Sequence, residues 1–197
     1  MAGDPAAQDR SARTSRMTIP NLITIARLLA VPLIVLLIGQ ERWGYAFALF
    51  AAAGVSDGVD GYIARRFHMR SELGAYLDAL ADKALLVSIY ITLSVTGVLP
   101  GWLAILVVSR DLMIVAAILV SWLMGRPVAI KPMFVSKLNT GAQIVFAALV
   151  LGTKAVILEA PTLYGTGMVL VAALTIVSAA AYLARWMRHM ASDVDGR

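Results

Sequence analysis

The sequence contains no cysteine, so disulfide bonds and metal sites built from thiolates are excluded. Histidine is nearly absent: His68 and His189 lie far apart, and neither has a second histidine at metal-ligand spacing. Charged residues make up only 15% of the chain, whereas 60% of the residues are hydrophobic and the mean hydropathy is +0.80. A water-soluble domain does not have this balance. The composition therefore predicts an integral membrane protein with a single membrane domain.

Long apolar runs predict an all-α, polytopic fold with six transmembrane helices, because about 20 apolar residues cross a bilayer as a helix. Glycine, proline and charged residues punctuate the runs. The expected spans are 21–39, 43–66, 72–97, 101–124, 133–152 and 162–186. The small and polar residues 1–16 are expected to form a disordered cytosolic tail. The membrane domain is expected at 17–190, followed by a C-terminal tail at 191–197.

Lysine and arginine are distributed unevenly between the two sides of the predicted spans. They gather in the N-terminal tail, in the connections after the second and fourth spans, and near the C-terminus, whereas the other side has only Arg42 and Lys154. The positive-inside rule then places both termini in the cytoplasm, or in the matrix for a mitochondrial inner-membrane protein. A bacterial inner membrane is the other expected location. The net charge of +5 suits anionic lipids, and a nucleic-acid partner is not expected because the cations are scattered.

Four aspartates stand out in this apolar chain: Asp57 and Asp60 are three residues apart, and Asp78 and Asp82 are four apart. Either spacing puts two carboxylates on one face of a helix. Both pairs lie near the cytoplasmic ends of consecutive, antiparallel spans, so the four can converge. An uncompensated intramembrane charge costs at least about 2.5–3.5 kcal/mol. Carboxylate oxygens favour Mg²⁺, Mn²⁺ or Ca²⁺, and four of them suit a pair of divalent ions.

Small residues accompany the aspartates and suggest a ligand that carries phosphate. Gly58, Gly61 and Ala64 leave one face of the second span bare, and Gly74 lies one turn before Asp78. Arg65 can bind phosphate through two hydrogen bonds. The alternatives are close helix packing for the glycines, and either a solvated helix end or an ion-transport pathway for the aspartates. The far halves of the second and third spans are nearly free of charge, which argues against transport.

The spacing of these residues also resembles a known signature. From Asp57 the chain reads D-G-V-D-G-Y-I-A-R, then eight residues, then G-A-Y-L-D-A-L-A-D. This is similar at every fixed position to the signature of the CDP-alcohol phosphatidyltransferase family, D-x₂-D-G-x₂-A-R-x₈-G-x₃-D-x₃-D. The segment "TIPNLITIARLLAVP" resembles the segment that precedes the signature in that family, and six spans is the family's architecture.

The resemblance implies an enzyme that moves a phosphatidyl group from CDP-diacylglycerol to an alcohol and releases CMP. It implies that Asp57, Asp60 and Asp78 bind metal, with two ions of Mg²⁺ or Mn²⁺ expected. Asp82 matches the general base and also lies close to the second metal. The residues that match the cytidine diphosphate site are Gly61, Ala64, Arg65 and Gly74. The family commonly forms homodimers, so a homodimer is expected here.

Three cations outside the signature are candidates for binding the acceptor alcohol. Arg110, Lys137 and Lys131 could line a second anion pocket beside the metals. The alternative is a partnership of Arg110 with Asp111 inside the bundle, with the lysines acting as positive-inside anchors.

The segments "VSRDLMIVAA" and "KPMFVSKLNTGAQ" look most like the branch of CMP-forming cardiolipin synthases, whose acceptor is phosphatidylglycerol. The runner-up branch, the phosphatidylglycerophosphate synthases, uses glycerol 3-phosphate. Its members usually have Arg-Glu where this chain has Arg110-Asp111, and often a second lysine where this chain has Asn139. One fewer cation suits the singly charged phosphodiester of phosphatidylglycerol.

Two charged residues outside the signature have open roles. Arg27 shares a helical face with Asn21 and Thr24, and this face is either a nucleotide contact or an anchored helix start. Lys83 follows Asp82 but points about 100° away from it around the helix, and we interpret it as a counter-charge.

Overall fold

The computed structural model describes residues 19–66, 72–124 and 134–192. Within these ranges the chain forms six helices and no strand, which confirms the predicted all-α fold. The predicted tail at 1–16 lies outside the described residues, and the last helix continues through Ser192. The helices are α2 (Ile19–Gly39), α3 (Trp43–Arg66), α4 (Glu72–Val95), α5 (Gly101–Leu123), α6 (Phe134–Ala155) and α7 (Pro161–Ser192).

The connection between α4 and α5 shows how the sequence ends a helix. Gly97 adopts a φ of 74°, in the left-handed region that glycine enters without steric cost. The backbone N–H groups of Val98 and Leu99 then both donate to the carbonyl oxygen of Leu93, which satisfies the end of α4. Pro100, in an extended conformation, directly precedes α5. A glycine and a proline therefore set the sharp reversal between the two helices.

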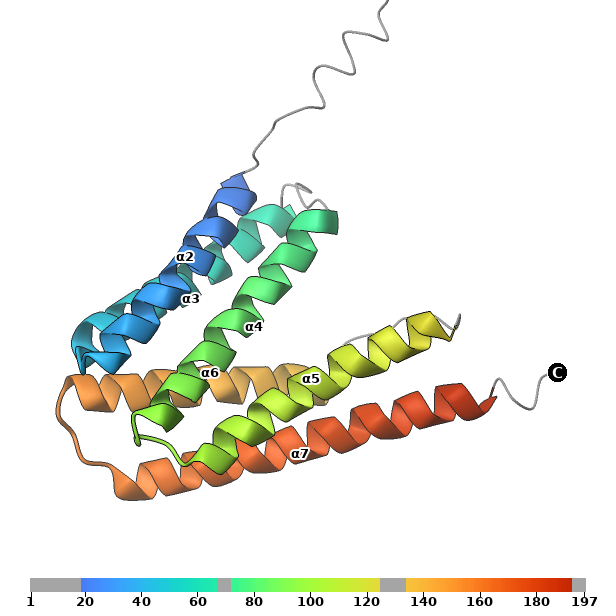
Figure 1. Ribbon diagram of the computed structural model, residues 1–197. Coiled ribbons are helices and arrows are strands. Elements are labelled where there is room, and N and C mark those ends of the chain that lie inside the picture. Colours follow the sequence, from blue (N-terminus) through green and yellow to red (C-terminus); the bar gives the residue numbers. More distant parts are fainter. Residues whose placement is uncertain (1–18, 67–71, 125–133, 193–197) are drawn as a thin grey trace, which may run out of the picture.

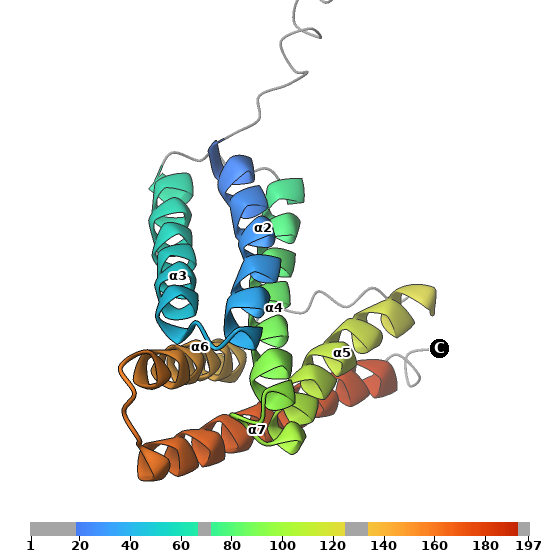
Figure 2. The same cartoon turned by 60° about the vertical axis from the view of Figure 1, so that its left-hand side comes forward.

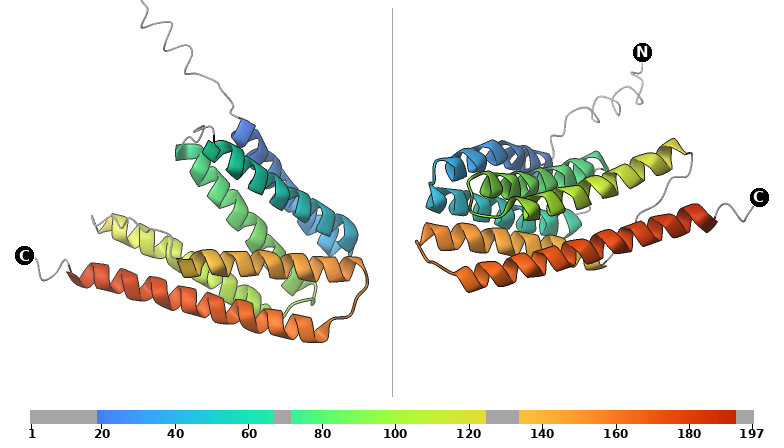
Figure 3. Two further views of the ribbon diagram at one scale, coloured as in Figure 1. Left: turned by 180° about the vertical axis from the view of Figure 1, so that it is seen from behind. Right: turned by 60° about the horizontal axis from the view of Figure 1, so that its bottom comes forward.

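The six helices form two groups (Figures 1 and 2). In the first, α2 packs against both α3 and α4. In the second, α7 packs against both α5 and α6. The second group is inclined to the first, and contacts of α3 with α6 and of α4 with α5 and α6 join them (Figure 3). The sequence suggested that α3 and α4 face each other directly, but the contacts described for α3 are with α2 and α6.

The bundle has two different ends. The start of α2, the end of α3 and the start of α4 lie together at what we call the signature end (Figure 1). The α2–α3, α4–α5 and α6–α7 connections lie at the opposite end (Figure 1). The hydrophobic core is built mainly from the helix segments nearest this opposite end. Its members include Ile34, Ile38, Phe50, Leu86, Ile89, Tyr90, Leu93, Leu103, Phe146, Val150 and Val171.

Three of the described helical segments are long and apolar enough to cross a membrane: Gly101–Leu123, Phe134–Ala155 and Pro161–Arg188. Shorter apolar segments occupy Ala26–Gly39 in α2 and Trp43–Ser56 in α3. The charged residues of the signature interrupt the apolar character of α3 and α4. Large apolar side chains such as Leu29, Ile105 and Val169 are exposed on the helix surfaces, as expected for surfaces that face lipid. The chain is therefore a membrane protein.

Candidate active site

The backbone of the signature spans the end of α3 and the start of α4, so that both acidic segments lie at the signature end (Figure 1). The predicted metal-binding and nucleotide-binding side chains of this segment are, apart from Asp82, outside the described side chains. Their contacts stay predictions from the sequence. These residues are Asp57, Asp60, Gly61, Ala64, Arg65, Gly74 and Asp78.

Asp82, the predicted general base, forms an ion pair with Arg27 of α2. The Arg27 guanidinium donates a hydrogen bond of 2.5 Å to Asp82 Oδ1. The Arg27 side chain is only 3% exposed, whereas the Asp82 side chain is 42% exposed. A short, charge-assisted bond of this kind fixes the carboxylate in position while part of it stays accessible. The sequence left the role of Arg27 open, although an arginine inside an apolar run already indicated a buried partner.

Among the residues whose side chains are described, no group of three or more Asp, Glu, His or Cys residues could hold a metal ion. Three of the four predicted ligands are not among those residues. Asp82, the remaining one, already binds a cationic group, Arg27, so its position suits positive charge. The all-carboxylate donor set also fits a hard divalent ion.

Lys83, next to Asp82, connects α4 to α5. Its ammonium group lies 2.6 Å from Asp111 Oδ1, and the same oxygen accepts a 2.6 Å hydrogen bond from the Arg110 guanidinium. One carboxylate oxygen therefore joins two cations on different helices. Residues 82 and 83 are held from two sides, the first by α2 and the second by α5.

Arg110 has further partners on the remaining helices. Its second terminal nitrogen donates to Ser136 Oγ of α6 at 2.6 Å and to Ser178 Oγ of α7 at 2.8 Å. The guanidinium carbon lies 5.7 Å from the centre of the Tyr182 ring, within the range of a cation–π interaction. The Arg110 side chain is 3% exposed. These are the contacts of the alternative interpretation, in which Arg110 and Asp111 are partners within the bundle.

Among the described residues, the structure gives no contact with Arg110 for the two lysines of the predicted acceptor pocket. Lys137 is exposed near the start of α6, next to Ser136. Lys131 lies outside the described residues. The acceptor prediction did not include Lys83, but the structure places it in contact with Asp111, the partner of Arg110. The role of Lys137 stays a prediction.

A buried polar cluster packs α6 against α4 and α7. Thr175 donates to the side-chain oxygen of Asn139 at 2.9 Å, and the Gln143 amide lies 3.4 Å from the Thr175 hydroxyl. The Tyr90 hydroxyl donates to the backbone oxygen of Gln143 at 3.1 Å. Asn139 is fully buried in this cluster. The residue that stands in place of a second lysine therefore contributes to helix packing.

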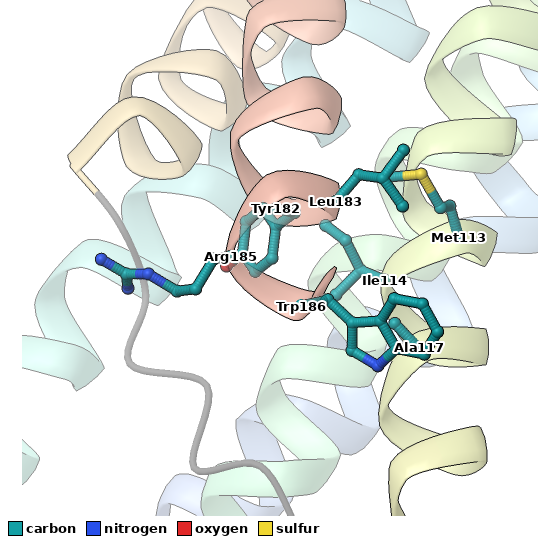
Figure 4. A pocket seen from close by; sticks show the side chains of 7 residues that line it. All are labelled: Met113, Ile114, Ala117, Tyr182, Leu183, Arg185 and Trp186. Carbon is teal, nitrogen blue, oxygen red and sulfur yellow. The ribbon is translucent and has the colours of Figure 1, made fainter. Parts of the chain in front are cut away.

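A pocket lies between α5 and α7 (Figure 4), at a place that no residue pattern in the sequence indicated. Its lining is almost entirely apolar, and the Trp186 indole at its edge donates a 2.9 Å hydrogen bond to Ser121. Its lining includes no carboxylate, histidine or thiol, and we assign it no catalytic role. It is lined by Met113, Ile114, Ala117, Tyr182, Leu183, Arg185 and Trp186.

Comparison with known proteins places the chain in a family. The family model for CDP-alcohol phosphatidyltransferase matches residues 17–179, and the chain belongs to this family. Among curated relatives, the chain is 36% identical over 172 residues to a cardiolipin synthase (CMP-forming) of Rattus norvegicus, which covers 74% of this chain and 57% of the relative.

Two further relatives carry the same name. The human protein is 35% identical over 147 residues, which are 66% of this chain and 49% of the relative. The protein of Streptomyces coelicolor is 36% identical over 118 residues, which are 56% of this chain and 55% of the relative. The chain thus spans about half the length of the curated relatives it matches.

Proposed function

We propose that this protein transfers a phosphatidyl group from CDP-diacylglycerol to the hydroxyl group of phosphatidylglycerol, giving cardiolipin and CMP. The observation that carries the proposal is the complete family signature across α3 and α4, within a chain whose family membership is clear. The ion pair of Asp82 with Arg27 supports it, because it holds the proposed base at the same end of the bundle.

The chemistry assigned to the chain is simple. The acceptor hydroxyl attacks the β-phosphorus of CDP-diacylglycerol, Asp82 takes the hydroxyl proton, and the bond from that phosphorus to the CMP oxygen breaks. Gly61, Ala64, Arg65 and Gly74 would bind the cytidine diphosphate. Two Mg²⁺ or Mn²⁺ ions held by the four signature aspartates would neutralise the pyrophosphate charge. Arg27 keeps the Asp82 carboxylate oriented toward the substrate.

The choice of acceptor rests on similarity and on charge. The three relatives described above are all named cardiolipin synthase. Asn139 in place of a second lysine suits a singly charged phosphodiester better than the nearly doubly charged phosphate of glycerol 3-phosphate. Phosphatidylglycerophosphate synthesis from glycerol 3-phosphate is the second candidate, because it needs the same donor and the same signature.

Membrane placement completes the proposal. Both termini and the active site would face the cytoplasm or the matrix, because lysine and arginine concentrate on that side of the helices. There the acyl chains of the substrates stay in lipid while their headgroups reach the signature end. A homodimer is proposed from the family resemblance alone, and chemical crosslinking in membranes tests it.

The deciding experiment offers purified protein CDP-diacylglycerol and Mg²⁺ with each acceptor in a separate reaction. We expect CMP and cardiolipin with phosphatidylglycerol, and much less CMP with glycerol 3-phosphate. Product from glycerol 3-phosphate alone would replace the first candidate by the second. No CMP with either acceptor would reject both.

A further inference from the structure

Lys83 is the cation nearest in sequence to the proposed base, and its surroundings differ from those of Arg110. The Lys83 side chain is 44% exposed, whereas Arg110 is 3% exposed. Among the described residues Lys83 has one ion-pair partner, Asp111, while Arg110 is bonded to Asp111, Ser136 and Ser178. A phosphate group can therefore reach Lys83 without breaking up the packing of three helices.

The hydrogen-bonding capacity of the two cations points the same way. A lysine ammonium has three donors on a flexible stem, so a contact with Asp111 leaves two donors for another anion. Both terminal nitrogens of Arg110 are already used within the bundle. The remaining Arg110 Nε–H has no hydrogen-bond partner among the described residues but is buried, so a phosphate would have to enter the packed interior to reach it.

Asp111 links the Lys83 side chain to Arg110. Its Oδ1 accepts from both Lys83 and Arg110, and Arg110 is fixed by its own bonds to α6 and α7. Arg110 therefore fixes Asp111, and Asp111 directs the long side chain of Lys83 toward α5. Without Asp111 the ammonium group would be free to take many rotamers.

We propose that Lys83 binds the phosphate of the acceptor, and that Asp111 and Arg110 are positioning residues that hold it ready. The inference rests on the proposed function. Phosphatidylglycerol and glycerol 3-phosphate both carry phosphate at one end of a glycerol and the reactive hydroxyl at the other. Asp82 and Lys83 point about 100° apart around the helix, and the four-carbon stem of lysine lets its ammonium group reach the phosphate end of either acceptor while Asp82 faces the hydroxyl end. The interpretation of Lys83 as a counter-charge is thereby extended to a binding role.

The first test compares the substitutions Lys83→Gln and Lys83→Arg by steady-state kinetics, with each substrate varied in turn. Loss of a hydrogen bond to a charged group should raise the acceptor KM of Lys83→Gln about tenfold or more, with less than about a twofold change in the KM for CDP-diacylglycerol. Lys83→Arg should recover most of the loss. Lys154→Gln, near the opposite end of the bundle, is the control and should keep the wild-type acceptor KM.

The second test needs no variant, so it stays informative if Lys83→Gln fails to fold. Wild-type protein is labelled with an amine-reactive reagent, and the rate at each lysine is followed by mass spectrometry. Phosphatidylglycerol or glycerol 3-phosphate should slow labelling of Lys83 several-fold, while phosphatidylcholine should not, and Lys154 should label equally throughout. The acceptor that protects Lys83 more strongly identifies the preferred ligand.

An unchanged labelling rate at Lys83 with both acceptors, or an unchanged acceptor KM in folded Lys83→Gln, would overturn this inference. A rise in both substrate KM values by the same factor would also overturn it, because it would indicate only a structural ion pair between α4 and α5. If wild-type protein releases no CMP, the proposed function fails instead, so the two failures are distinguishable.

Discussion

The two ends of the helix bundle use different interactions. Near the opposite end, the helices close over a hydrophobic core in which Ile34, Ile89 and Leu103 are fully buried. Toward the signature end, ion pairs join the helices: Arg27 of α2 pairs with Asp82 of α4, and Lys83 of α4 pairs with Asp111 of α5. Asp111 also pairs with its chain neighbour Arg110. In a membrane, a buried charge is costly unless it is paired, and these ion pairs offset that cost for the charged residues near the signature. We infer that the core supplies most of the stability and that the signature end supplies the chemistry.

The largest expected effect is on CMP release, and it comes from replacing the proposed base at the signature end. The substitution Asp82→Asn keeps the shape of the side chain but removes the proposed base, so CMP release should fall about 10²- to 10⁴-fold. The amide oxygen of the substituted side chain can still accept a hydrogen bond from the buried Arg27, so the thermal unfolding midpoint in detergent should fall less than in Arg110→Met, although one charge of the ion pair is lost. Near-normal CMP release from this variant would remove Asp82 from the role of base.

The next prediction concerns the stability contributed by Arg110, which lies between the two ends of the bundle. Arg110→Met leaves Asp111 with Lys83 as its remaining ion-pair partner and leaves Ser136 and Ser178 without their donor. Breaking a buried pair is strongly destabilising, and we expect a loss of about 3 kcal/mol in the free energy of unfolding. Denaturant titration in mixed micelles measures it. The exposed Arg188→Gln on α7 is the control, and equal stability of the two variants would contradict a structural role for Arg110.

Helix packing in the core is tested at Gly167. A Cβ at this position would overlap the ring of Phe146, which is buried on the facing α6. Gly167→Ala should therefore lower the free energy of unfolding by about 1–3 kcal/mol. A Cβ at Gly165, on the same helix, would meet nothing within 4 Å. Gly165→Ala should be neutral or slightly stabilising, and an equal loss in both variants would show that α6 and α7 do not pack as described.

The smallest effect concerns a single buried hydrogen bond. Tyr90→Phe removes the donor to the backbone oxygen of Gln143, which links α4 to α6. We expect a loss of about 1 kcal/mol, with CMP release close to that of the wild type. Tyr45→Phe, on the exposed surface of α3, should have no measurable effect on stability. A large loss of activity in Tyr90→Phe would show that the core and the site are more strongly coupled than we infer.

Much of the fold was predictable, because long apolar runs bounded by glycine, proline and charge define helices with little ambiguity. The expected spans at 43–66 and 101–124 agree with α3 and α5 to within one residue. The family could also be recognised from the sequence, because the signature depends only on residue identity and spacing. The extent of α7 was less so: it continues to Ser192, because its polar last turns carry no apolar signal.

The partnerships of the charged residues could not be predicted in the same way. Arg27 and Asp82 are 55 residues apart, and their contact depends on how α2 and α4 are rotated about their own axes. The same holds for Lys83 and Asp111, which lie on different helices. The sequence shows that an intramembrane charge needs a partner, but helix packing decides which one. For this reason the sequence left the partners of Lys83 and Arg110 open, and the structure shows that both contact Asp111.

The central claim is that α3 and α4 together form one ionic centre at the signature end. Mn²⁺ binding to detergent-purified protein, followed by electron paramagnetic resonance, tests it without any enzymatic readout. We predict that wild-type protein binds about two ions, and that Asp57→Asn on α3 and Asp78→Asn on α4 each weaken binding strongly. If the wild type bound no Mn²⁺, or if either substitution left binding unchanged, the two helices would not share a metal centre and the account would be wrong.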